Sequence, residues 1–287
     1  MATTEKGKPA KTSSFGRPDL ASLLGLVVAV GGILTGLLME GGKIQDVKQV
    51  TAAIIVLGGT IGAVMVTTPQ AILISAVRRL ASAFVDKAPN PSTIIDELIK
   101  YATKARKEGI VALEQDAEAI QDPFLRKALN LAVDGTDLQQ LRKMMELEIS
   151  LMEQAGEAEA KVYEAAGGYA PTVGIIGAVL GLIQVMKHLA DIDEVGRGIA
   201  VAFVATVYGV GVSNLFFLPI GQKLRGRLHN QVRIKELMLD GVIGIVEGLN
   251  PKLLRTKLEP YASSGVRGKP KASPKQQAAS QPVRAES

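Results

Sequence analysis

The chain has 287 residues, of which 47% are apolar and 21% are charged, and its formal net charge is +5. A mean hydropathy of +0.22 is high for an ordinary water-soluble domain, so the charged residues must gather in particular segments. The absence of cysteine excludes disulfides, thiol nucleophiles and cysteine-based metal sites. The two histidines, His188 and His229, lie far apart in the sequence, so we expect no metal site and no cofactor.

Four stretches carry no Asp, Glu, Lys or Arg: residues 20–39, 49–77, 165–186 and 198–222. A membrane-crossing helix needs about 20 mostly apolar residues, and each stretch is long enough. The second stretch is longer than a span requires, which indicates an interfacial end. The sequence therefore predicts an all-α integral membrane protein, with four transmembrane helices in two hairpins and a helical cytoplasmic domain between spans 2 and 3.

The basic residues that flank the stretches give an orientation. They lie in the N-terminal arm, after the second stretch and after the fourth stretch: Lys6, Lys8, Lys11, Arg17, Arg78, Arg79, Lys223, Arg225 and Arg227. The positive-inside rule places these three segments on the cytoplasmic side. The short connections 40–48 and 187–197 are mixed in charge and should face the outside. Both termini are therefore predicted to be cytoplasmic.

Six regions follow from this topology. They are a basic arm (1–18), a transmembrane hairpin (19–78), a helical cytoplasmic domain (79–164), a second hairpin (165–222), a cytoplasmic helix (223–260) and a tail (261–287). The tail has too few apolar residues to order itself. In the cytoplasmic domain, Asn90-Pro91 and Asp122-Pro123 are helix start signals. A further helix after Asp137 meets no breaker before Gly156 and is expected to continue into the third span.

Small residues gather on one helical face of the third and fourth stretches. They are Gly174, Gly177, Ala178 and Gly181, and then Gly198, Ala202, Ala205, Thr206, Gly209 and Ser213. Small faces allow membrane helices to approach closely, so helix packing is one interpretation. The other is an ion route, because Thr206 is the hydroxyl deep in the fourth stretch.

Pro171 and Pro219 are expected at similar depth, near the cytoplasmic ends of the third and fourth spans. A proline inside a membrane helix removes an N–H and frees a carbonyl, so the pair can form a hinge. Alternatively, Pro171 begins a helical turn and Pro219 ends one. Both interpretations are open from sequence alone.

Enzyme motifs are absent from the sequence, which contains no G-x-S-x-G, no H-E-x-x-H and no nucleotide loop with a lysine. We therefore expect no enzymatic activity. A lone solute carrier usually has more spans and an intramembrane polar site. If ions cross here, a second polypeptide must bring the carboxylate, because the spans hold no ionisable residue. The chain is best interpreted as a subunit.

Three segments in the second hairpin, 169–182, 205–209 and 214–219, resemble the MotA/PomA family of flagellar stator proteins. The segment 105–114 resembles that family's cytoplasmic loop motif. The second hairpin alone would also fit the related ExbB/TolQ energisers of outer-membrane processes. The first hairpin and the Arg106 to Glu114 motif favour the stator.

The resemblance implies a homo-pentamer in the bacterial inner membrane around MotB-type single-span, peptidoglycan-anchored chains whose aspartate binds the ion. Proton flow would then turn the flagellar rotor. By the family pattern Thr206 faces the ion route, and Pro171 and Pro219 couple ion passage to conformational change. Arg106 and Glu114 would meet the rotor switch protein, although the residues alone indicate a solvated helix face.

The coupling ion is the remaining alternative. Sodium-driven members of the family tend to carry additional threonines in the last two spans, where this chain has Ala178 and Ala205. Sodium needs several oxygen ligands, so this departure favours protons over a sodium-driven stator.

Overall fold

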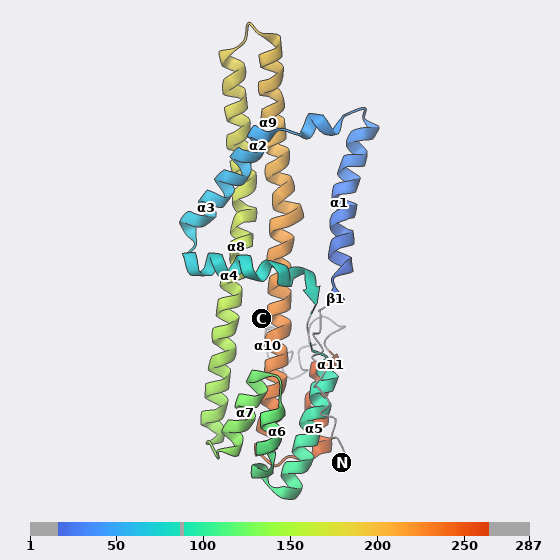
Figure 1. Ribbon diagram of the computed structural model, residues 1–287, viewed down its shortest axis with the longest axis vertical. Helices are drawn as coiled ribbons and strands as arrows, with labels where there is room; N and C mark the ends of the chain where they lie inside the picture. Colours follow the sequence, from blue (N-terminus) through green and yellow to red (C-terminus); the bar gives the residue numbers. More distant parts are fainter. Residues whose placement is uncertain (1–16, 87–88, 264–287) are drawn as a thin grey trace, which may run out of the picture. The chain divides into compact units, whose positions relative to one another are not determined.

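The computed structural model describes residues 17–86 and 89–263, which divide into two compact units (Figure 1). Of the described residues, the first unit holds 17–86 and 150–231, and the second holds 89–149 and 232–263. Most of the predicted N-terminal arm (1–18) and most of the predicted tail (261–287) lie outside the described residues.

Four helical segments of the described chain are long and apolar enough to cross a membrane: Leu20–Met39, Ile44–Thr67, Leu138–Lys187 and Ile192–Val246. A helix satisfies its own backbone polar groups, as a lipid-exposed segment requires. The predicted all-α membrane fold with four spans is confirmed. Among the described residues, strand is limited to β1 (Arg17–Pro18) and β2 (Val85–Asp86), a short antiparallel pair that the sequence did not indicate.

The first unit contains the membrane helices and their turns. Its elements are α1 (Leu20–Met39), the 3₁₀ turn η1 (Ile44–Val47), α2 (Val50–Ala53), the π turn η2 (Ile54–Gly58), α3 (Gly59–Thr67), α4 (Gln70–Leu80), the 3₁₀ turn η3 (Ala81–Phe84), most of α8 (Leu138–Lys187), α9 (Ile192–Val212), the π turn η5 (Ser213–Phe217) and the first part of α10 (Leu218–Val246). The long helix α8 runs without interruption, as predicted, from the inserted segment into the third span.

Glycines bring the backbones of α8 and α9 into contact. A Cβ atom built on Gly174 would lie 2.9 Å from the carbonyl oxygen of Ala205, and one on Gly181 would lie 2.7 Å from that of Gly198. No real side chain tolerates such distances, so these positions must stay without a Cβ. Most of the small face predicted from the sequence is therefore a helix-packing surface.

The segment α2–η2 packs on α9 through a small apolar cluster of Ala52, Val56, Val204 and Ala205. Tyr208 extends this contact, because its hydroxyl donates to the carbonyl oxygen of Val47 at 2.5 Å. The same hydroxyl accepts from the backbone N–H of Gln49 at 3.4 Å. The second span is thus fixed to the fourth near the turn η1.

The second uncharged stretch bends at Pro69, where α3 has ended and Thr68 is extended. The helix that follows, α4, crosses α8 instead of continuing α3 (Figure 1). Tyr163 on α8 donates to the carbonyl oxygen of Ala76 on α4 at 2.9 Å. The interfacial end expected from the length of this stretch is therefore a separate helix, with its own contacts to α8.

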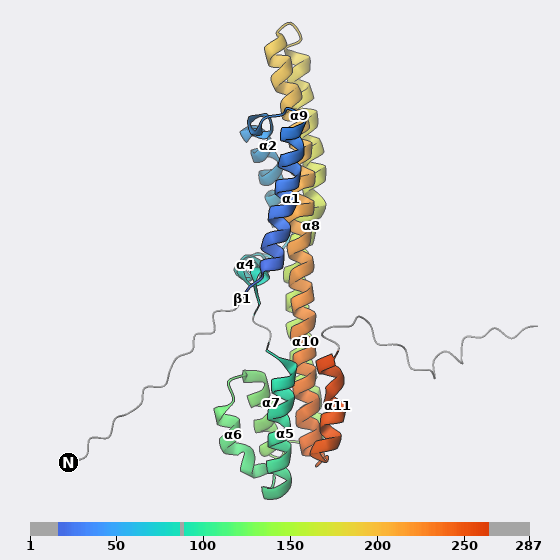
Figure 2. The same ribbon diagram turned by 90° about the vertical axis from the view of Figure 1, so that its right-hand side faces the viewer.

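The second unit is a cluster of short helices. Its elements are α5 (Pro91–Glu108), the 3₁₀ turn η4 (Ile110–Leu113), α6 (Glu114–Ala119), α7 (Pro123–Val133), the start of α8, the end of α10 and α11 (Pro251–Ser263). Asn90 and Asp122 cap α5 and α7 through their side-chain oxygens, as predicted. Helix α5 contacts α11, and Figure 2 shows both of them next to the end of α10. The apolar core of the second unit includes Phe124, Leu125 and Leu129 of α7, all about 1% exposed.

Candidate functional site

Pro171 and Pro219 both lie inside continuous helix. Pro171 is in the middle of α8, and Pro219 is the second residue of α10, directly after the π turn η5. The alternative in which Pro171 begins a helical turn and Pro219 ends one is therefore wrong, because helix precedes and follows both residues. Each proline lacks the N–H that an interior helical residue donates, and each leaves a carbonyl one turn earlier without that donor.

Thr206 lies on the open side of α9. Its hydroxyl donates to the carbonyl oxygen of Ala202 on the same helix at 3.2 Å. The sequence grouped Thr206 with the small face, but the structure separates it from that face. Ala205 is fully buried against the neighbouring spans, whereas Thr206 is exposed within this chain. One residue advances a helix by about 100°, which explains the difference.

Large apolar side chains surround Thr206 on this exposed side. Phe203, Val207 and Val210 are 71%, 52% and 47% exposed. Helix α8 also carries exposed apolar residues: Ile175, Ile176, Val179, Leu180, Leu182 and Ile183. Such a surface must be covered by lipid or by other membrane helices. The stretches 165–186 and 198–222 contain hydroxyl groups but no carboxylate, imidazole or basic side chain.

Arg106 and Glu114 belong to the second unit. Arg106 lies in the last turn of α5, Glu114 begins α6, and the chain turns between them at Gly109, whose φ of +85° favours glycine. Both side chains are exposed, and neither forms an ion pair with another described residue. Their charges are therefore available to a partner.

The turn that separates Arg106 from Glu114 is held by the ion pair between Lys104 and Asp116. The Lys104 Nζ atom lies 2.7 Å from Asp116 Oδ2. The hydrogen bond to Asp116 raises the pKa of the Lys104 ammonium group above its usual value. The ion pair joins α5 to α6 and limits how far the two exposed charges can separate.

A cavity of about 390 Å³ opens beside Arg106 within the second unit. Its walls come from the end of α5 and from two turns that end in glycines of positive φ, Gly135 and Gly248. Apolar side chains, among them Ile110 and Ile245, line it. The exposed guanidinium group thus stands next to a partly apolar hollow, which suits a partner with both charged and apolar side chains.

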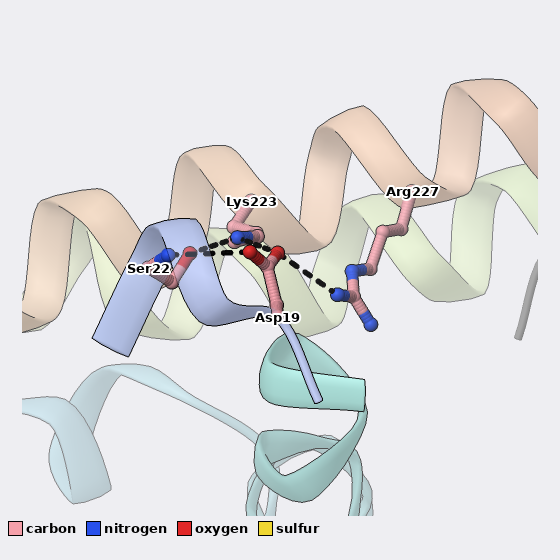
Figure 3. A network of polar contacts seen from close by, with 4 residues as sticks. All are labelled: Asp19, Ser22, Lys223 and Arg227. Carbon is pink, nitrogen blue, oxygen red and sulfur yellow. Dashed lines mark hydrogen bonds and ion pairs between the residues drawn. The ribbon is translucent and has the colours of Figure 1, made fainter. Parts of the chain in front are cut away.

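A charged cluster that the sequence analysis did not identify fixes the start of α1 (Figure 3). Asp19 caps α1 by accepting from the backbone N–H of Ser22 at 3.2 Å, and it forms an ion pair with Lys223 of α10. Arg227 lies 3.5 Å from the same carboxylate. The hydrogen bond from Lys223 lowers the pKa of Asp19. Asp19 and Lys223 lie far apart in the sequence. The only sequence signal for their contact is that each lies directly next to a membrane-spanning stretch.

Among the described residues, His, Asp and Glu form no group of three or more that could bind a metal ion.

Two family models match the chain: the N-terminal model of motility protein A over residues 23–109, and the MotA/TolQ/ExbB proton channel family over residues 116–237. Motility protein A of Helicobacter pylori (strain ATCC 700392 / 26695) is 35% identical over 247 residues, which cover 86% of this chain and 96% of the relative. The chain belongs to the motility protein A family. It is a flagellar motor stator subunit of that family, as its motifs predicted.

Solved structures of this family share the fold. The C. jejuni MotAB structure has a TM-score of 0.81 at 32% identity, covering 85% of this chain and 95% of that one. The flagellar MotAB stator complex from Bacillus subtilis has a TM-score of 0.78 at 33% identity, covering 84% and 95%. The match to the motility protein A N-terminal model spans the first hairpin, which the sequence analysis used to favour the stator over the ExbB/TolQ energisers.

Proposed function

We propose that this motility protein A family member joins a MotB-type single-span subunit, conducts protons across the bacterial inner membrane and uses their flow to turn the flagellar rotor. The proposal rests on one observation above all. The stretches 165–186 and 198–222 contain exposed apolar residues and Thr206, but no Asp, Glu, His, Lys or Arg. A proton path needs a titratable group, so a partner helix must supply a carboxylate beside these stretches.

A ring of this chain, which we take to be a pentamer, would enclose the partner helices. The apolar residues of α8 and α9 that stay exposed within the described chain suit such an enclosure. The solved relatives are MotAB complexes by name. The charge of the flanking segments supports cytoplasmic termini.

Protons suit the spans better than sodium. Of the two alanines where sodium-driven members tend to carry threonine, Ala205 is fully buried, and a Cβ on Gly177 would lie 2.8 Å from its Cβ. Neither Ala178 nor Ala205 has a side-chain oxygen that could bind sodium, whereas Thr206 contributes one hydroxyl. Each proton that crosses releases about 2.3 kcal/mol per 100 mV of membrane potential, which is the energy available for rotation.

The rotor contact is proposed at Arg106 and Glu114, with the neighbouring cavity as a receptor for an apolar side chain of the rotor protein. Two exposed charges of opposite sign, without partners in the described chain, suit a partner surface that carries both signs. A mixed charged and apolar surface is the usual composition of a specific protein interface.

The partner is tested by purifying the tagged chain from its native membrane in mild detergent and identifying the bound proteins by mass spectrometry. Cells with the untagged chain provide the control. We expect a single-span protein with one membrane aspartate and a periplasmic peptidoglycan-binding domain. A short partner with a TonB- or TolR-like periplasmic domain would instead assign the chain to the ExbB/TolQ energisers and remove the rotor roles of Arg106 and Glu114.

A further inference from the structure

The backbone carbonyl that Pro171 deprives of its helical donor has found another donor. In an α-helix the N–H of residue 171 would donate to the carbonyl of Gly167, and proline has no N–H to give. The hydroxyl of Ser213 donates to this carbonyl oxygen instead, at 2.6 Å. Ser213 is 1% exposed, so no water competes for the bond. The defect in α8 is thus repaired by a side chain from the other helix of the hairpin.

Ser213 also begins the irregular turn that precedes the second proline. Its own carbonyl oxygen accepts the N–H of Leu218, five residues later, which closes the π turn η5. Pro219 follows immediately. A π turn shifts the hydrogen-bond register by one residue, and such turns in helices are frequently found at functional positions. Ser213 therefore forms a hydrogen bond next to each proline. Its side chain bonds to Gly167, one turn before Pro171, and its carbonyl oxygen bonds to Leu218, directly before Pro219.

Side-chain packing reinforces this connection. A Cβ atom on Gly167 would lie 2.5 Å from Cδ2 of Leu218, so the leucine occupies the space that any side chain at 167 would need. Gly167, Ser213 and Leu218 thus form one contact between α8 and the junction of η5 with α10. This contact lies close in sequence to Pro171 on one helix and to Pro219 on the other.

We propose that Ser213 is a positioning residue that couples Pro171 to Pro219, so that the two helices bend together during the torque cycle. This inference deepens the proposed function, because it depends on the prolines acting as the conformational link. An unpaired carbonyl in a buried, apolar site is strongly unfavourable. Gly167 and Ser213 therefore remain together, and a displacement at Pro171 carries the start of η5 with it.

The test is a double-mutant cycle on the complete complex of this chain with its single-span partner. The variants are Ser213→Ala, Pro171→Ala and the two combined, with thermal unfolding of the purified complex and swimming speed as measurements. Ser213→Ala should lower Tm by roughly 2–4 °C and slow swimming, because the Gly167 carbonyl loses its donor. In the Pro171→Ala background the new N–H of residue 171 donates to Gly167, so Ser213→Ala should change Tm by less than half as much.

Two further variants separate this role from general packing. Ser213→Thr keeps the hydroxyl and should restore Tm and swimming relative to Ser213→Ala. Thr67→Ala removes a hydroxyl that donates only to carbonyls of its own helix, Ala63 and Val64, and should leave both measurements unchanged. Should Thr be too large for the site, the double-mutant cycle still decides.

Equal Tm losses from Ser213→Ala in both backgrounds would overturn the proposal, and so would full swimming speed in Ser213→Ala. The Tm measurements do not depend on the complex being a motor. If the purified partner were not of the MotB type, the proposed function would fail while the hydrogen-bond coupling of Ser213 and Pro171 would still be measured.

Discussion

The hydroxyl of Thr206 donates a hydrogen bond within α9, but its oxygen can still act as an acceptor. It donates to Ala202, and its oxygen can still accept hydrogen bonds from the exposed side of the helix. A proton path along this surface would need such an acceptor beside the partner's carboxylate, because Phe203 and Val207 on either side of it are apolar.

We predict that Thr206→Ala slows swimming without weakening the complex. The side chain is exposed within the chain and bonds only to its own helix, so the free energy of unfolding should change by no more than about 0.5 kcal/mol. Thr206→Ser keeps the hydroxyl and should swim faster than the alanine variant. The comparison is made at equal amounts of assembled complex. Swimming of Thr206→Ala at wild-type speed would contradict the role assigned to this residue.

The carboxylate of Asp19 should make stability depend on pH. Its pKa in the folded chain is lowered from 3.8, chiefly by the hydrogen bond from Lys223, so its contribution is present above pH 3.8 and is lost as the pH falls through the lowered value. In Asp19→Asn the amide oxygen still caps α1 but carries no charge.

Thermal unfolding of the wild type and of Asp19→Asn, recorded from pH 7 down to pH 2, measures this effect. The wild type should have the higher Tm at neutral pH, and the difference should shrink below pH 3.8. A Tm difference that stayed constant over the whole range would show that the Asp19 charge contributes nothing.

Glycines determine how closely α8 and α9 pack against each other. Gly209 faces α8 so closely that a Cβ would lie 2.6 Å from the carbonyl oxygen of Ala170 and 3.0 Å from the Cα of Gly174. These are backbone atoms, which cannot rotate away. An added methyl group must therefore separate the helices.

We predict that Gly209→Ala destabilises the hairpin by roughly 1–3 kcal/mol, the range expected for overpacking a close-packed contact. Gly211→Ala is the matched control on the same helix, because a Cβ there has no atom of the described chain within 4 Å. Unfolding of the two purified complexes in denaturant measures the difference. Equal stabilities would mean that α8 and α9 can move apart without loss.

The turn between α5 and α6 presents Arg106 as an exposed charge without a partner in the described chain. We predict that Arg106→Glu strongly reduces swimming, while the free energy of unfolding changes by no more than about 0.5 kcal/mol. Lys100→Glu makes the same charge change at another exposed position of α5 and should swim normally. If both variants swam equally poorly, the effect would come from net charge and not from a contact at Arg106.

At the scale of the whole molecule, local signals were sufficient for much of the fold. Four spans follow from uncharged stretches, and the helix starts at Asn90 and Asp122 follow from a capping residue beside a proline. Each of these signals involves neighbours in sequence. The length of the second uncharged stretch indicated an interfacial end, but it did not indicate that α4 is a separate helix.

Contacts between distant residues were not predictable. The sequence offered no means of pairing Tyr208 with Val47, or Ser213 with Gly167, since each pair depends on how two helices are rotated against each other. The rotation of α9 about its axis also determines which of its residues are covered, so that Ala205 is buried and Thr206 is exposed. The residues of the candidate site were identified by resemblance, and their surroundings required the fold.

The peripheral position of α1 has a practical consequence. None of its residues is buried within the described chain, and Val28, for example, is 65% exposed. The sequence has no cysteine, so one introduced at Val28 would be the only thiol of this chain for a fluorescent or spin label. A reporter there would test the proposed ring and its rotation without altering a residue that is buried within the chain.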